Sequence, residues 1–211
     1  DVSSVQAAHA AFVERLVDRY DASVADDEAL DVWRRAVGRH FNERDGTEFR
    51  SARAAYAVAT EAVLGRSVPE DEWFPLFRAT VRDHLRPNPG ASEVTARLAD
   101  AGIYQGIVSD VDAEEGEFLL DHLNVLAHVD DVTTSEEVGR PKPDSAMFET
   151  ALEKSPVLAE RTVMVGDRYE HDMAGAAEHG IRPVSHGADD GPAVAYVADD
   201  LSDVLSIVDV E

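Results

Sequence analysis

The sequence predicts an α/β protein in which a small four-helix bundle precedes a parallel β-sheet core covered by helices. Residues 5–85 show helical periodicity without a convincing strand, whereas residues 86–211 alternate short apolar runs with helical segments. The stretch RPNPGASEV, Arg86–Val94, separates the two, because its prolines and glycine end one helix and introduce another. We therefore expect a helical domain at 5–85 and an α/β domain at 86–211.

In the first part, apolar residues recur at helical spacing. The first helix presents an apolar face that consists of Val5, Ala8, Phe12, Leu16 and Val17. Further helices are expected at 30–41, Phe49–Leu64 and Trp73–Leu85, and turn-rich stretches separate them. Short links between consecutive helices are typical of an antiparallel bundle.

In the second part, predicted strands and helices alternate. Strands are expected at Ile103–Ser109, Val129–Thr133, Thr162–Val165 and Arg182–Ser185. Helices are expected at Glu93–Ala101, Glu114–Leu123, Ser145–Glu153, Met173–His179 and Leu201–Val208. The strands are continuous apolar runs, which is typical of a parallel sheet buried on both faces.

Charge is the strongest global feature of the chain. Asp and Glu number 43 against 19 Lys and Arg, for a net charge of −24, and the acids are scattered along the chain. Nucleic acid and anionic membranes are therefore excluded as expected partners. The composition resembles that of a halophile's cytosolic protein, and the absence of cysteine fits a reducing, cytoplasmic location. Lysine is scarce: only Lys142 and Lys154 occur.

The stretch TVMVGDRYEHDMAGAAEHGI, Thr162–Ile181, places two carboxylates where a predicted strand gives way to a helix. Asp167 and Asp172 have two interpretations. Asp167 can start a turn while Asp172 caps the helix that begins at Met173. Alternatively, the two form a cation site at the carboxyl end of a parallel strand, where open α/β sheets bind ligands.

Two other segments bring polar residues to the same edge of the predicted sheet. Ser109 ends one strand, and the segment GRPKPD, 139–144, carries Lys142 before a helix. Alone, Ser109 is an ordinary turn residue, Lys142 a solvated surface group, and Asp110 and Asp112 helix caps. Together, a hydroxyl, an ammonium and carboxylates suit a phosphoryl group with a hard divalent cation such as Mg²⁺.

The order Ser109, Lys142-Pro143 and Gly166-Asp167-x4-Asp172 resembles motifs II, III and IV of the haloacid dehalogenase-like (HAD) hydrolase superfamily. The resemblance implies a Rossmann-like core with a helical cap of the C1 type. It also implies a phosphohydrolase that acts on a small phosphorylated metabolite, with Mg²⁺ as cofactor and an aspartyl-phosphate intermediate. By resemblance, Ser109 and Lys142 bind the phosphoryl group and are catalytic. Asp167 and Asp172 form the metal site: Asp167 ligates Mg²⁺ directly, and Asp172 acts on metal-bound water or on Lys142.

The chain departs from the family pattern in two places. Residues 1–211 contain no motif I, D-x-D-G-T, so no nucleophile is assigned. We expect a short upstream segment to carry it, because a sheet without its central strand exposes two ladder edges; a variant that has lost catalysis is the alternative. In addition, Asp110 stands where the family usually has asparagine, and a negative charge there is unfavourable for phosphate unless it is paired or points away.

Two rival functions remain open. A 2-haloacid dehalogenase also uses an aspartate nucleophile, but it typically carries serine and asparagine in place of Gly166-Asp167. A non-catalytic protein that binds phosphate or a partner on the same fold is the second. A phospho-receiver domain also pairs acidic residues with a hydroxyl and a lysine, but it lacks a helical insert and is much shorter. The sequence assigns neither a particular metabolite nor an oligomeric state.

The net charge of −24 predicts that the protein loses stability at low salt, because unscreened repulsion among scattered acids grows with the Debye length. The melting temperature should rise between about 0.1 and 2 M KCl, a range over which the Debye length falls from roughly 10 Å to below 3 Å. Thermal unfolding followed by circular dichroism tests this. A melting temperature independent of KCl would count against a halophilic origin.

Overall fold

The computed structural model describes residues 1–43, 46–187 and 191–210. The chain forms two compact units. Asp1–Gly46 and Arg50–Pro87 make up unit 1, and Thr47–Phe49 with Asn88–Glu211 make up unit 2. The short segment 47–49 therefore belongs to the α/β unit, although it lies within the helical part of the sequence. No described helix is long and apolar enough to cross a membrane.

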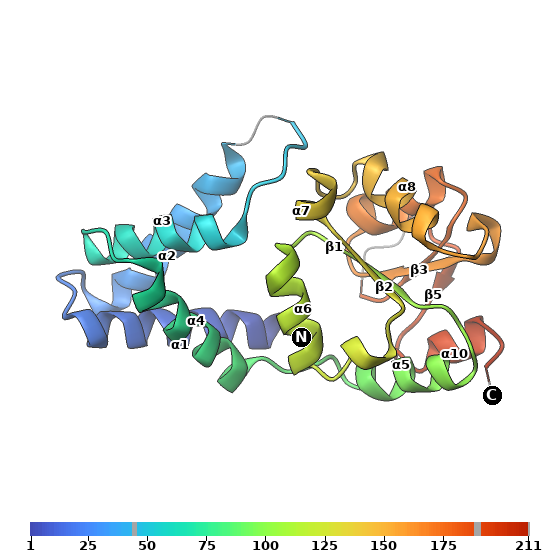
Figure 1. Ribbon diagram of the computed structural model, residues 1–211, viewed down its shortest axis with the longest axis horizontal. Helices are drawn as coiled ribbons and strands as arrows, with labels where there is room; N and C mark the ends of the chain where they lie inside the picture. The colour runs from blue at the N-terminus through green and yellow to red at the C-terminus, as the bar shows by residue number, and fades with distance from the viewer. Residues whose placement is uncertain (44–45, 188–190, 211) are drawn as a thin grey trace. The chain divides into compact units, whose positions relative to one another are not determined.

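Unit 1 is helical (Figure 1). Its helices are α1 (Val2–Tyr20), α2 (Asp26–Asn42), α3 (Ala52–Leu64) and α4 (Glu70–His84). The α3 helix begins three residues later than the sequence predicts. Ser51 caps it by accepting a hydrogen bond from the Ala54 amide, and the Phe49 amide donates instead to the Gly139 carbonyl in unit 2.

The buried face of α1 differs slightly from the predicted one. Ala8, Phe12, Leu16 and Val17 are buried as expected, but Val5 is 37% exposed. The neighbouring Ser4 takes the inward position, and its hydroxyl donates to the Asp1 carbonyl.

Aromatic rings fill the core of unit 1. Trp33 and Trp73 are fully buried, and Phe12 packs against both. His9 lies among these rings, with centroid distances of 4.8 Å to Trp33 and 5.6 Å to Tyr56. Burial, with a smaller contribution from the Arg34 charge, lowers the pKa of His9 from 6.5 to about 4.

Unit 2 has the alternating organisation that the sequence predicts. Its larger elements are α5 (Ala91–Asp100), β1 (Gly106–Ser109), α6 (Ala113–His122), β2 (Asp131–Thr134), α7 (Ser135–Val138), α8 (Ser145–Lys154), β3 (Val163–Gly166), η3 (Tyr169–Ala174), α9 (Gly175–Glu178), β4 (Arg182–Ser185), β5 (Tyr196–Val197) and α10 (Asp203–Ile207). Short 3₁₀ turns, Leu126–His128 and Ala159–Arg161, precede β2 and β3. The predicted helix at Met173–His179 is instead a π-helical turn, η3, followed by the short α9.

All strand pairings are parallel, as expected, but the described strands form two sheets rather than one. β1 pairs with β2, and β3, β4 and β5 pair in that order. Within the described residues, no ladder joins β1 to β3. Residues of both strands are only half-buried, whereas β4, which has a neighbour on each side, buries Pro183 to Ser185.

Helices cover the strands of unit 2 on both sides, with α5 and α10 on one side and α8 on the other (Figure 1). Val94 and Leu98 of α5 pack with Val184 of β4 and with Val204 and Leu205 of α10. A second cluster joins α8 to α9 and consists of Met147, Phe148, Ala176 and Ile181. This layered arrangement is the α/β class that the continuous apolar strands predict.

The partly buried position of His9 makes the stability of unit 1 depend on pH. Because the folded-state pKa is depressed, stability is fully present above the unfolded-state pKa of 6.5 and falls below it, where the unfolded chain takes up a proton that folded His9 does not bind until about pH 4. The free energy of unfolding should drop by about 2 kcal/mol between roughly pH 7 and pH 5 from this residue. Urea unfolding followed by tryptophan fluorescence measures it. His9→Gln should flatten that part of the profile, and an unchanged pH dependence in this variant would contradict the assignment.

Candidate active site

The predicted site residues lie where strands of unit 2 end. Ser109 is the last residue of β1, and Asp167 directly follows Gly166, the last residue of β3. Lys142 lies in the segment 139–144, which leads into α8. The side chain of Asp144 caps α8 by accepting a hydrogen bond from the Ala146 amide.

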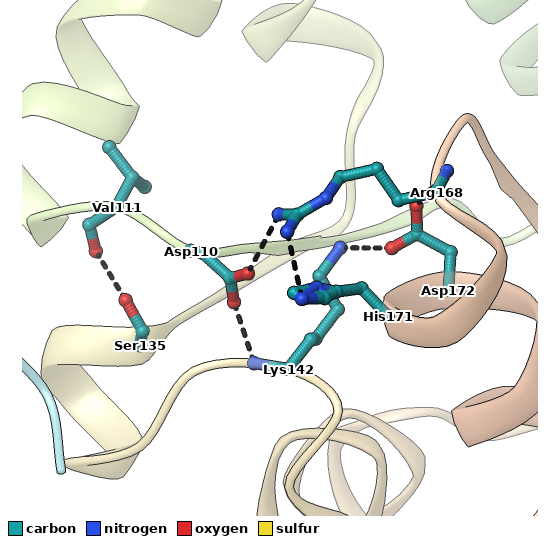
Figure 2. A network of polar contacts seen from close by, with 7 residues as sticks. All are labelled: Asp110, Val111, Ser135, Lys142, Arg168, His171 and Asp172. Atoms are coloured by element: carbon teal, nitrogen blue, oxygen red, sulfur yellow. Dashed lines mark hydrogen bonds and ion pairs between the residues drawn. The ribbon is translucent and has the colours of Figure 1, made fainter. Parts of the chain in front are cut away.

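Lys142 and Asp172 form a direct ion pair (Figure 2). The Lys142 Nζ lies 2.6 Å from Asp172 Oδ1, and the side chains are only 12% and 4% exposed. The second oxygen of Asp172, Oδ2, accepts a hydrogen bond of 3.1 Å from the Arg168 amide. Both carboxylate oxygens of Asp172 are therefore engaged. Asp172 lies inside the π-helical turn, so it does not cap a helix that begins at Met173.

The glycine before Asp167 makes room for Asp172. A Cβ atom at Gly166 would lie 2.5 Å from the Asp172 Cβ and 2.6 Å from its Oδ2. A π-helical turn is wider than an α-helical turn, and such turns are frequent at functional sites. The η3 turn and Gly166 together bring the Asp172 side chain back against the end of β3.

Asp110 is paired, which resolves the difficulty that the sequence raises. Its Oδ1 accepts a hydrogen bond of 2.7 Å from the Lys142 amide, and its Oδ2 lies 3.8 Å from Arg168 Nη1. Asp110 is therefore not a helix cap. Asp112 occupies the N-cap position of α6.

Sequence reasoning missed Arg168 and His171, which complete this network (Figure 2). Arg168 Nη2 lies 2.8 Å from His171 Nε2. Burial is the main cause that lowers the pKa of His171, and the Arg168 charge adds to it. The signal was present in the sequence, since both basic residues lie between the two aspartates of Gly166-Asp167-x4-Asp172.

The segment that carries Lys142 is held at both ends. The Gly139 carbonyl accepts the Phe49 amide at 2.9 Å. Asp144 Oδ2 accepts hydrogen bonds from the Thr47 hydroxyl at 2.7 Å and from Arg140 at 3.0 Å. The Thr47 hydrogen bond is the largest of the causes that lower the pKa of Asp144. These contacts fix the backbone on either side of Lys142.

The site residues differ in the hydrogen bonds and ion pairs that their side chains make. Lys142 and Asp172 contact each other, whereas the side chains of Ser109 and Asp167 have no hydrogen bond or ion pair with another residue in the described part of the chain. Asp167 is exposed at the end of β3. No group of three or more acidic or histidine side chains that could hold a metal ion occurs among residues 1–43, 46–187 and 191–210.

The donor set therefore fits a divalent cation only in part. Asp167 presents a carboxylate whose oxygens have no partner in the described chain, which suits a direct ligand of a hard cation. Asp172 fits that role less well, because an ammonium and a backbone amide occupy its two oxygens.

The chain belongs to the haloacid dehalogenase-like hydrolases. That family matches residues 53–185, which is more than half of the chain. The fold agrees with this assignment. The magnesium-bound structure of the HAD-hydrolase YfnB from Bacillus subtilis has a TM-score of 0.72 and 19% sequence identity, and the match covers 97% of this chain and 92% of that chain.

The curated relatives include phosphatases named for two different substrates. One is a ribulose-1,5-bisphosphate 5-phosphatase of Halopiger xanaduensis, 45% identical over 65 residues, which are 31% of this chain and 27% of the relative. The other is a glyceraldehyde 3-phosphate phosphatase of Methanothermobacter thermautotrophicus, 34% identical over 84 residues, or 39% and 37% of the two chains. The matched region thus spans about a third of the length of these relatives.

Because Gly166 and Asp172 lie so close together, we expect a single methyl group at position 166 to lower the stability of the protein. Gly166→Ala should lower the free energy of unfolding by about 1–3 kcal/mol, because Asp172 must move and leave Lys142 without its partner. Gly106→Ala in β1 is the matched control, since the Cβ there would meet only the Tyr104 ring at 3.7 Å. Denaturant unfolding of both variants tests the difference. Equal stability of the two would show that Gly166 is not needed to seat Asp172.

Proposed function

We propose that the protein is a phosphohydrolase that acts on a small phosphorylated metabolite and depends on Mg²⁺. The observation that carries this proposal is the buried Lys142–Asp172 ion pair beside the ends of parallel strands that present Ser109 and Asp167. An ammonium held by a buried carboxylate is positioned for an anionic substrate. The relatives named as phosphatases of phosphorylated sugars support the same substrate class.

Each residue has a distinct role in the proposed reaction. The Ser109 hydroxyl donates a hydrogen bond to one phosphoryl oxygen, and Lys142 balances the negative charge that the transferring group carries. Asp172 fixes the Lys142 ammonium, which is the second of the two roles that the family resemblance implies for it. Asp167 would hold the Mg²⁺, which supplies charge neutralisation at the phosphoryl oxygens when bound.

The nucleophile is the one component that residues 1–211 lack. We propose that a strand bearing D-x-D-G-T pairs with the half-buried strands β1 and β3, which no ladder joins within the described chain. Its first aspartate would attack phosphorus and release the alcohol, to which the second aspartate gives a proton. Water would then cleave the aspartyl-phosphate and regenerate the carboxylate.

The alternatives make different demands on the same residues. A 2-haloacid dehalogenase needs no metal, so it leaves the exposed carboxylate of Asp167 without a role. A non-catalytic phosphate-binding protein needs Ser109 and Lys142, but it needs neither a nucleophile nor Asp167. Both fit the observed geometry less completely than a phosphohydrolase does.

Assays of the full-length protein test the proposal. It should hydrolyse a generic phosphate monoester with Mg²⁺ and lose that activity with EDTA. Asp167→Asn should remove most activity, at least about 100-fold, because a neutral oxygen replaces a charged ligand. Lys142→Ala should be similarly severe, because it leaves the buried carboxylate of Asp172 without its partner. Glu160→Gln, an exposed site in the turn before β3, is the control and should leave the rate unchanged.

Three outcomes would contradict parts of the proposal. Robust turnover by residues 1–211 alone would show that the missing motif is dispensable. Release of halide from a 2-haloacid without Mg²⁺ would move the protein to the dehalogenases. Phosphate binding without turnover in the full-length protein would favour the non-catalytic alternative.

A further inference from the structure

Four residues around the site form a closed ring of alternating charge. Asp110 accepts the Lys142 amide and faces the Arg168 guanidinium. Asp172 accepts the Arg168 amide and holds the Lys142 ammonium. Each aspartate thus binds the backbone of one cation and the side-chain charge of the other. We call these four residues, Asp110, Arg168, Asp172 and Lys142, the charge ring (Figure 2).

The charge ring connects the three segments that carry the site. Asp110 follows β1, Lys142 lies before α8, and Arg168 and Asp172 follow β3. Its net charge is zero, with two carboxylates against an ammonium and a guanidinium. Removal of any one charge leaves a net unit charge on the ring, and Asp110 of the ring directly follows Ser109, the proposed phosphate ligand, in the chain.

The two ion pairs of the ring are not equivalent. The Lys142–Asp172 pair is short and buried, whereas Arg168 and Asp110 are 57% and 24% exposed and 3.8 Å apart. An exposed pair at this distance contributes little to stability. Its effect on phosphate affinity can still be large, because an uncompensated charge a few ångströms from a bound dianion changes the free energy of binding directly.

We propose that Arg168 is a positioning residue that makes an acid at position 110 compatible with phosphate binding. Asp110 fixes the Lys142 backbone through Oδ1, and Arg168 cancels the charge that this carboxylate places next to Ser109. This inference rests on the proposed function, since it assigns the pair a task in binding the same phosphoryl group. Arg168 acts indirectly, through its effect on Asp110.

The consequence is a specific pattern of rescue. Arg168→Gln leaves the Asp110 charge uncompensated, so it should raise KM for a phosphate monoester and Ki for inorganic phosphate by about three- to tenfold, with kcat changed less than about twofold. Asp110→Asn keeps an oxygen acceptor for the Lys142 amide but removes the charge. The double variant Asp110→Asn/Arg168→Gln should therefore return KM and Ki to within about twofold of the wild type.

Two further measurements separate an electrostatic role from a merely structural one. The effect of Arg168→Gln on Ki should shrink between about 0.1 and 2 M KCl, because salt screens the exposed Asp110 charge. Asp110→Ala, which also removes the acceptor for the Lys142 amide, should lower kcat more than Asp110→Asn does. Arg161→Gln is the matched control: Arg161 is exposed near the opposite end of β3 and should leave KM, Ki and kcat unchanged.

The experiment is a double-mutant cycle on the full-length protein, with p-nitrophenyl phosphate as substrate and inorganic phosphate as inhibitor. Rescue of Arg168→Gln by Asp110→Asn supports the proposal. An Arg168→Gln variant that behaves like Arg161→Gln, or additive effects of the two substitutions, would overturn it while leaving a phosphatase in place.

A second measurement tests the coupling between Asp110 and Arg168 if the proposed function fails. If the wild type turns over no phosphate monoester, the same cycle is followed through ligand-free melting temperatures. Coupling between the two sites of about 1–3 °C would show that the pair is formed and balanced in solution. Additive melting temperatures would then overturn the inference independently of any activity.

Discussion

The buried ion pair between Lys142 and Asp172 is the interaction on which the site depends. Removing two charges from water costs several kcal/mol per ion, and only close contact with further hydrogen bonds offsets that cost. The structure provides both, through the 2.6 Å contact and the Arg168 amide on the second oxygen of Asp172. The pair therefore requires that the segment before α8 and the turn after β3 stay in place together. Gly166 permits this placement because any side chain there would displace Asp172.

Much of this arrangement can be predicted from the sequence, because it rests on residue types at fixed places along the chain. The continuous apolar strands indicate a parallel sheet, and the spacing of Gly166, Asp167 and Asp172 indicates a ligand site after a strand. The partners of Asp110 cannot be predicted in this way. They lie in two other segments, before α8 and after β3, and residue types alone do not specify where these segments meet the end of β1. The position of Asp172 depends on η3, a π-helical turn that a helical pattern at Met173–His179 does not distinguish from an α-helix. The later start of α3 also involves a contact between residues distant in sequence, since the Phe49 amide donates to the Gly139 carbonyl.

The described strands form two parallel sheets, and the strands differ in burial and in the number of their neighbours. A strand with one hydrogen-bonding neighbour leaves a ladder edge unpaired. β4 has two neighbours and buries Pro183 to Ser185, whereas β1, β2 and β3 have one each in the described chain. β1 and β3 are half-buried, and β2 buries only its last two residues. Polar side chains bridge the carboxyl ends of these two strands through Asp110 and Arg168. This long, exposed contact lies between the two strand ends, although no ladder connects the strands in the described chain.

The scarcity of lysine gives a further reason to regard the Lys142 site as specialised. The Lys142 ammonium contacts Asp172 Oδ1, whereas the Lys154 ammonium lies where three oxygens converge. The Lys154 Nζ contacts the Val132 carbonyl at 3.0 Å, Glu137 at 2.9 Å and Asp131 at 3.0 Å, which ties α8 to β2 and α7. A guanidinium is planar, and its donors are fixed in a fork, so it cannot direct three hydrogen bonds from one point as an ammonium can. Of the two lysines in this arginine-rich chain, Lys154 thus ties α8 to β2 and α7. Lys142 holds Asp172 in the candidate active site.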